Sequence, residues 1–192
     1  MPVTIPWCPP TNGLGENRSP ARAGPATKAF RILREHGELV AERSLKAAGR
    51  VGHLKPDLAF IREAAMLHDI AIFQTDSPGI DCHGAEPYVR HGVLGRDILD
   101  ALDMHRHGLV CERHVGVGIS AEDIGRFNLP LPVRDMRPVT LEEQIICYAD
   151  KFFSKNGGGA PREKSIAEIV ASLRPYGADK VERFMGWVEL FG

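Results

Sequence analysis

The feature that most constrains this chain is an apolar helical run, residues 64–70, that contains an adjacent histidine and aspartate, His68 and Asp69. Burying an imidazole and a carboxylate side by side costs free energy unless another group pairs with both. A divalent metal ion is the most economical partner for such a pair. We therefore expect a helical protein in which further histidines and aspartates complete a metal site around His68 and Asp69.

Length and composition are those of an ordinary globular protein. The 192 residues are enough to bury a core without disulfides, and the apolar share of 43% is typical of this class. The net charge of −1 gives no electrostatic case for nucleic acid as the main partner. We expect a cytoplasmic protein, because the cysteines are scattered and the sequence shows no recognisable secretory leader. We expect no membrane contact, because no apolar run is long enough to span a bilayer.

The N-terminal segment differs from the rest of the chain, because residues 1–25 are rich in proline and glycine. Prolines remove amide donors and glycines raise the entropy cost of ordering the backbone. We expect a flexible tail over residues 1–25 and a single all-α helical domain over residues 26–192. No stretch shows the alternation that predicts a convincing strand.

Apolar residues recur at helical spacing through most of the domain. Gly49 is expected to end the first helix, and the capping boxes of Thr140 with Glu143 and of Ser165 with Glu168 are expected to begin later helices. Residues 74–85 are expected to form a polar loop at the rim of the site. The helices are expected over about residues 27–48, 56–68, 86–103, 109–115, 121–127, 140–154, 165–173 and 179–191.

Several polar residues share the inward stripes of these expected helices. A lone histidine on an apolar face is more often a hydrogen-bonded core residue than a ligand, but here the set as a whole comes from facing helices, as in metal sites of helix bundles. Nitrogen and carboxylate ligands without thiolates favour Fe or Mn, with Zn, Co and Ni also suitable. The candidate ligands of one or two ions are His36, His68, Asp69, His91, His114 and Asp150.

The order of these residues resembles that of the HD superfamily of metal-dependent phosphohydrolases. Residues 65–71 look like its core motif, close to the HDIG subgroup but with Ala71 in place of the glycine. The resemblance covers about residues 30–155 and implies an HD-type helical fold in which His68 and Asp69 serve catalysis. The minimal metal set of the family matches His36, His68, Asp69 and Asp150, and the extra pair of its two-metal members matches His91 and His114.

The resemblance implies hydrolysis of a phosphate ester or anhydride, with a nucleotide or dinucleotide as the small phosphorylated partner and a metal-activated water as the nucleophile. Cyclic-dinucleotide members carry a lysine soon after the His-Asp pair and a paired histidine, and this chain has neither, which disfavours that subgroup. The candidate substrate contacts are His83, Arg90, Glu112, Arg113 and Lys151, with Lys155 as a further cation for the phosphate.

Two other functions are compatible with the same ligand set. Some relatives of the HD superfamily hold a di-iron centre and oxidise their substrates with oxygen. A non-catalytic interaction module that keeps a metal for stability is the second alternative, and a homo-oligomer is compatible with each function. The remaining histidines His53, His105 and His107 are expected to be solvated.

Overall fold

The computed structural model describes residues 27–155 and 162–192, so the tail expected over residues 1–25 lies outside the described residues. The all-α expectation is confirmed for the described part. The α-helices are α1 Lys28–Arg50, α2 Leu58–Leu67, α3 His91–Asp100, α4 His105–Arg113, α5 Ala121–Arg126, α6 Leu141–Asp150, α7 Ile166–Leu173 and α8 Ala178–Phe191. Short 3₁₀ helices are η1 Gly52–Leu54, η2 Ile72–Gln74, η3 Pro78–Ile80, η4 Tyr88–Arg90 and η5 Arg174–Tyr176.

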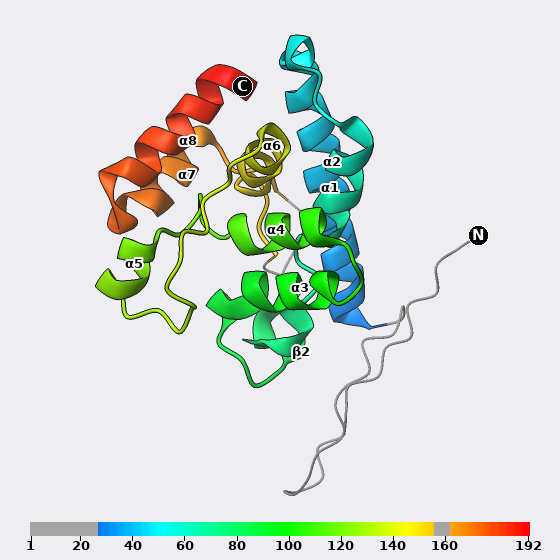
Figure 1. Cartoon of the computed structure of the whole chain (residues 1–192), viewed down its shortest axis with the longest axis vertical. Coiled ribbons are helices and arrows are strands. Elements are labelled where there is room, and N and C mark those ends of the chain that lie inside the picture. The colour runs from blue at the N-terminus through cyan, green and yellow to red at the C-terminus, as the bar shows by residue number, and fades with distance from the viewer. Residues whose placement is uncertain (1–26, 156–161) are drawn as a thin grey trace, which may run out of the picture.

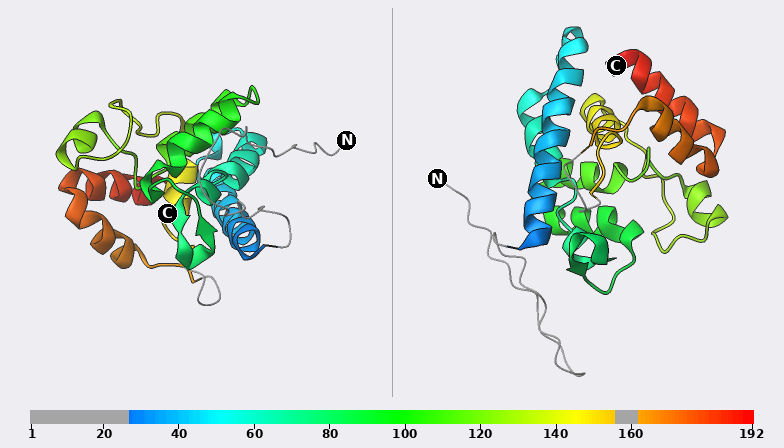
Figure 2. Two further views of the ribbon diagram at one scale, coloured as in Figure 1. Left: turned by 90° about the horizontal axis from the view of Figure 1, so that it is seen from below. Right: turned by 180° about the vertical axis from the view of Figure 1, so that it is seen from behind.

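Helix α6 lies at the centre of the fold, between the α1–α2 pair on one side and α7 and α8 on the other (Figures 1 and 2). Helices α3 and α4 pack against each other, and α4 also contacts α2 and α6. The main core includes Ile61 of α2, Ile145 and Tyr148 of α6, and Phe184 of α8, all almost completely buried. This packing brings one end of each of several helices to the same region of the interior.

Short polar side chains begin several of the helices, as the sequence predicts. The capping box of Thr140 and Glu143 begins α6, and that of Ser165 and Glu168 begins α7. Each hydroxyl accepts a hydrogen bond from the backbone N–H three residues later, while the acidic side chain accepts one from the cap residue's N–H. The capping box at Ser120, which begins α5, was not anticipated.

Some expected boundaries are wrong. Gly49 does not end α1; the helix continues to Arg50, and Val51 is its cap residue. The helix expected over residues 86–103 is divided into η4 and α3, and it ends early because Asp103 takes a left-handed conformation, with φ of 57°. Helix α4 accordingly begins at His105 rather than near residue 109.

The loop expected over residues 74–85 contains a small antiparallel pair of strands, β1 Asp76–Ser77 and β2 Cys82–His83. Asp76 pairs with His83, and Ser77 pairs with Cys82. Strands of two residues leave too little alternation for a sequence pattern to reveal them. Ile80 and Cys82 of this loop form a small buried cluster with Ile72 of η2 and Ala29 of α1.

Candidate metal centre

The candidate ligands gather in one buried cluster, as expected from the sequence. Most of them stand at helix ends, where a side chain can face the space between helices. Ligand atoms within 4.8 Å of one another form two groups, each of which could hold a metal ion. The first group is His36, His68, Asp69 and Asp150, and the second is Asp69, His91 and His114.

Asp69 belongs to both groups because its two carboxylate oxygens face different sides. Its Oδ2 lies 3.1 Å from His68 Nε2 and 3.4 Å from His36 Nε2, while its Oδ1 lies 3.5 Å from His91 Nε2 and 3.4 Å from His114 Nε2. His36 Nε2 also lies 2.9 Å from Asp150 Oδ1. A carboxylate in this position is suited to bridge two cations.

Backbone carbonyl groups fix the tautomer of three of the histidines. Since a carbonyl oxygen only accepts, each Nδ1–H must donate to it, and each Nε2 of a neutral ring then presents a lone pair to the cluster. The Nδ1 atoms of His68, His91 and His114 lie 2.6, 2.6 and 2.8 Å from the carbonyl oxygens of Ala65, Tyr88 and Cys111.

The orientation of these rings creates a need for a cation. The Nε2 atoms of His91 and His114 are 3.1 Å apart, and neither can donate to the other when both rings are neutral. Burial, together with the neighbouring His114, lowers the pKa of His91 to about 3, so the ring is neutral at physiological pH. Two lone pairs at this separation repel each other unless a cation lies within reach of both.

The buried carboxylates of the cluster also carry negative charge that a bound cation would balance. Burial would raise the pKa of Asp69, but His68 and Lys155 outweigh it and hold the pKa well below the ordinary value. Burial would lower the pKa of His68, yet the charges of Asp69 and Asp150 raise it to about 9. Among the described residues, Nδ1 of His36 and both oxygens of Asp69 are buried and accept or donate no regular hydrogen bond, although Oδ2 of Asp69 forms an ion pair with Lys155.

Two lysines supply positive charge at the edge of the cluster. Lys151 Nζ lies 2.8 Å from Asp150 Oδ2, and Lys155 Nζ forms an ion pair of 2.7 Å with Asp69 Oδ2. Imidazole nitrogens and carboxylate oxygens in buried groups of three and four are the donor set of a transition-metal site. The cluster therefore fits one or two divalent ions, with Asp69 shared.

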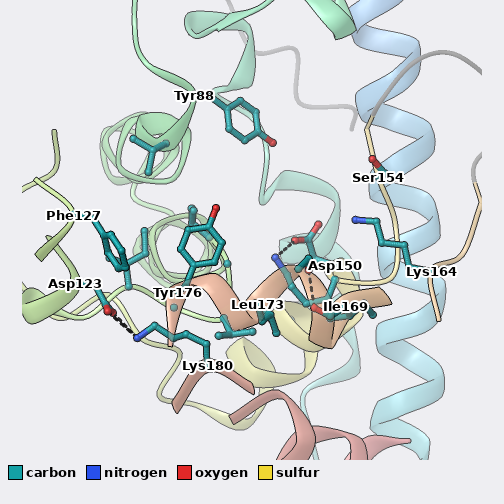
Figure 3. A pocket seen from close by; sticks show the side chains of 18 of the residues that line it. Tyr88, Asp123, Phe127, Asp150, Ser154, Lys164, Ile169, Leu173, Tyr176 and Lys180 are labelled. Atoms are coloured by element: carbon teal, nitrogen blue, oxygen red, sulfur yellow. Dashed lines mark hydrogen bonds and ion pairs between the residues drawn. The ribbon is translucent and has the colours of Figure 1, made fainter. Parts of the chain in front are cut away.

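A cavity of about 820 Å³ adjoins the cluster. Asp150, Lys151 and Lys155 line it on the metal side, and its opposite part is lined by Phe127 and Tyr176 (Figure 3). Figure 3 also shows the ion pair between Asp123 and Lys180 in this opposite part, where Nζ lies 2.8 Å from the carboxylate. The cavity thus joins a cationic end beside the metal ligands to an aromatic end.

Of the expected substrate contacts, the structure brings only Lys151 to the cavity, together with the further cation Lys155. His83 is exposed and pairs with Asp81. Arg90 donates to the carbonyl of Pro130 and pairs with Glu86. Glu112 lies between Arg96 and Arg134, and Arg113 binds Glu143. The contacts of Arg90, Glu112 and Arg113 connect separate parts of the fold, whereas the pair of His83 and Asp81 is local and exposed.

The remaining histidines are partly as expected. His53 is exposed, and His105 is exposed and pairs with Asp100. His107 is not fully solvated: it belongs to α4, and its ring makes an edge contact with Phe60 at 4.8 Å between centroids. Tyr88, Lys164 and Tyr176 line the cavity without having been anticipated, since no local pattern links residues so far apart in the chain.

No protein-family model matches this chain. An uncharacterized protein of Methanocaldococcus jannaschii is 39% identical over 95 residues, which are 49% of this chain and 48% of that protein. The tRNA (cytidine(56)-2'-O)-methyltransferases of Picrophilus torridus and Thermoplasma volcanium are each 32% identical, over 59% and 66% of this chain and 30% and 33% of their own lengths. The chain thus spans about half, or less, of the length of these curated relatives.

Among solved structures, the chain is similar to the HD domain of the L. monocytogenes phosphodiesterase PgpH. The similarity covers 82% of this chain and 89% of that one, with 15% sequence identity and a TM-score of 0.47. Among the described residues, no helix has both the length and the apolar character needed to cross a membrane.

Proposed function

We propose that the chain is an HD-type metal-dependent phosphohydrolase that cleaves a phosphate ester or anhydride in a nucleotide or dinucleotide. The observation that carries this proposal is the position of the two ligand groups. They share Asp69 and lie beside a cavity whose near end contains Asp150, Lys151 and Lys155. Candidate metal donors and lysine cations thus meet at one end of a space large enough for a nucleotide-sized ligand.

Each of the two ligand groups would bind one metal ion. His36, His68, Asp69 and Asp150 would hold one ion, and His91 and His114 would hold a second together with Asp69. Bound Fe or Mn would supply an acidified water and neutralise charge on phosphoryl oxygens. The carbonyl groups behind His68, His91 and His114 orient these rings before any ion binds, so little rearrangement is needed.

Lys151 and Lys155 would bind the phosphoryl group that reacts. In the structure their ammonium groups neutralise Asp150 and Asp69. Once cations neutralise these carboxylates, both ammonium groups can donate charge-assisted hydrogen bonds to phosphoryl oxygens in the cavity.

The opposite part of the cavity supports a nucleotide rather than a small phosphate ester. Phe127 and Tyr176 lie in edge contact there, with ring centroids 6.0 Å apart. Aromatic faces of this kind stack with a nucleobase. The nearby pair of Asp123 and Lys180 offers an acceptor and a donor to a base edge.

The test is a screen of the Mn- or Fe-loaded protein against nucleotides and dinucleoside polyphosphates, run with and without oxygen, with release of phosphate or nucleotide and consumption of oxygen as the readouts. We expect turnover that His68→Ala and Asp69→Ala each abolish, whereas His53→Ala, which removes an exposed histidine, keeps it. Full activity in either ligand variant would contradict the proposal. Turnover that needs oxygen would favour the oxygenase, and metal-dependent folding without any turnover would favour the interaction module.

A further inference from the structure

One lysine of the cavity differs from the others in its pairing. Lys151 pairs with Asp150, Lys155 with Asp69, and Lys180 with Asp123. Lys164 lines the same cavity and is half-buried, yet its side chain forms no ion pair with any residue that the structure describes. Within the described part of the cavity wall, its ammonium group is therefore a cation that an external anion would meet without displacing a carboxylate from an ion pair.

The acidic residues nearest to Lys164 in the sequence are already occupied. Glu163 pairs with Arg43 of α1. Glu168 pairs with Arg162 and also accepts hydrogen bonds in the capping box of α7. Neither carboxylate is free to neutralise Lys164, so the missing partner is not supplied by a local rearrangement of these pairs.

The main chain holds Lys164 in place beside the metal side of the cavity. Its backbone N–H donates to the carbonyl of Phe152, which follows α6 closely, at 2.8 Å. Figure 3 shows the side chain extending from this anchor toward the part of the cavity that contains Asp150. Burial lowers the pKa of Lys164, and the charges of Lys151 and Lys155 add to this decrease, while the charge of Asp150 offsets part of it.

We propose that Lys164 binds a second phosphoryl group of the substrate, next to the one that reacts, and so selects substrates with two neighbouring phosphoryl groups over simple monoesters. This inference rests on the proposed function. Lys151 and Lys155 form ion pairs with the candidate ligands Asp150 and Asp69 and are assigned to the reacting phosphoryl group. Lys164 forms no ion pair with a described residue, and the charge of Asp150 acts on it only from beyond ion-pair distance. A phosphoryl group matches such a free ammonium group in charge and in hydrogen-bond acceptors.

The test measures binding to the metal-loaded protein by calorimetry, with three probes that the protein does not hydrolyse: methylphosphonate, methylenediphosphonate and phosphonoacetate. The variants are Lys164→Ala, Lys164→Arg and a matched control, Lys46→Ala, which removes an exposed lysine that pairs with Glu42 on the surface of α1. Thermal melting of each variant checks that the fold is kept.

We expect Lys164→Ala to weaken methylenediphosphonate about tenfold and methylphosphonate less than about twofold, because one charged hydrogen bond is lost from only the larger probe. Lys164→Arg should keep most of the affinity, and Lys46→Ala all of it. Equal binding of methylenediphosphonate by the wild-type protein and Lys164→Ala would overturn the inference, as would an equal loss for both phosphonates.

The third probe separates a phosphoryl group from other anions. If phosphonoacetate depends on Lys164 as strongly as methylenediphosphonate does, the site accepts any second anion and the phosphoryl assignment is wrong. If the proposed function is wrong, the screen will show no metal-dependent turnover. That result does not depend on how the Lys164 variants bind these probes.

Discussion

Removing one histidine of the second ligand group should release one metal ion and leave the other. His91→Ala or His114→Ala leaves that group with only two protein donors, whereas His36, His68, Asp69 and Asp150 remain intact. At a free metal concentration of about 100 times the dissociation constant, each bound ion adds about 2.7 kcal/mol to the free energy of unfolding. For a chain of this size, this corresponds to a rise of about 5–11 °C in melting temperature.

The assay compares metal content and melting temperature with saturating Mn and with chelator. The difference between the two melts isolates the metal contribution, because any packing defect of the alanine variant is present in both. We expect the wild-type protein to hold two ions and each second-group variant to hold one, with about half of the metal-linked stabilisation. Asp69→Ala should lose both ions. A His91→Ala protein that keeps two ions, or the full metal-linked rise, would refute the reasoning.

Three further changes test the surroundings of the site. Glu112→Ala should lower the free energy of unfolding by about 2 kcal/mol in urea titration, because Arg96 and Arg134 lose their buried partner. The metal content should stay unchanged. A loss of activity without a loss of stability would instead make Glu112 a substrate contact. Thr140→Ala should cost about 1 kcal/mol in the same titration, because the α6 cap is lost. Burial raises the pKa of Asp123, but the hydrogen bond from Lys180 outweighs it and lowers the pKa to about 2. The stabilisation from Asp123 is therefore present above about pH 4 and lost as the pH falls toward 2, and melting over this range should show a weaker pH dependence in Asp123→Asn.

Several of the candidate ligands could be predicted from the sequence because they lie on a regular helical pattern. His36 shares its stripe with Val40 and Ala47, which are buried as expected. Asp150 is the last residue of a helix whose start is marked by the capping box of Thr140. Periodicity and capping are local properties, so they predict which face of a helix turns inward and where the helix begins.

Helical periodicity and capping could not predict the ion-pair partners of the charged residues outside the cluster. Glu112 and Arg113 stand close to the ligand His114 in the chain, but their partners Arg134 and Glu143 are 22 and 30 residues away. Such pairings depend on how loops and helices meet in the folded chain. The division of the third helix at His91 has a similar origin, since the ring's hydrogen bond to the Tyr88 carbonyl has no separate sequence signal.

The measurement that tests the central claim most directly is the distance between metal ions in the Mn- or Fe-loaded protein, by X-ray absorption or anomalous diffraction. The sharing of Asp69 between the two ligand groups predicts two ions about 3.5–4 Å apart, with one carboxylate oxygen on each. A single ion at full occupancy, or two ions that do not share Asp69, would contradict the account.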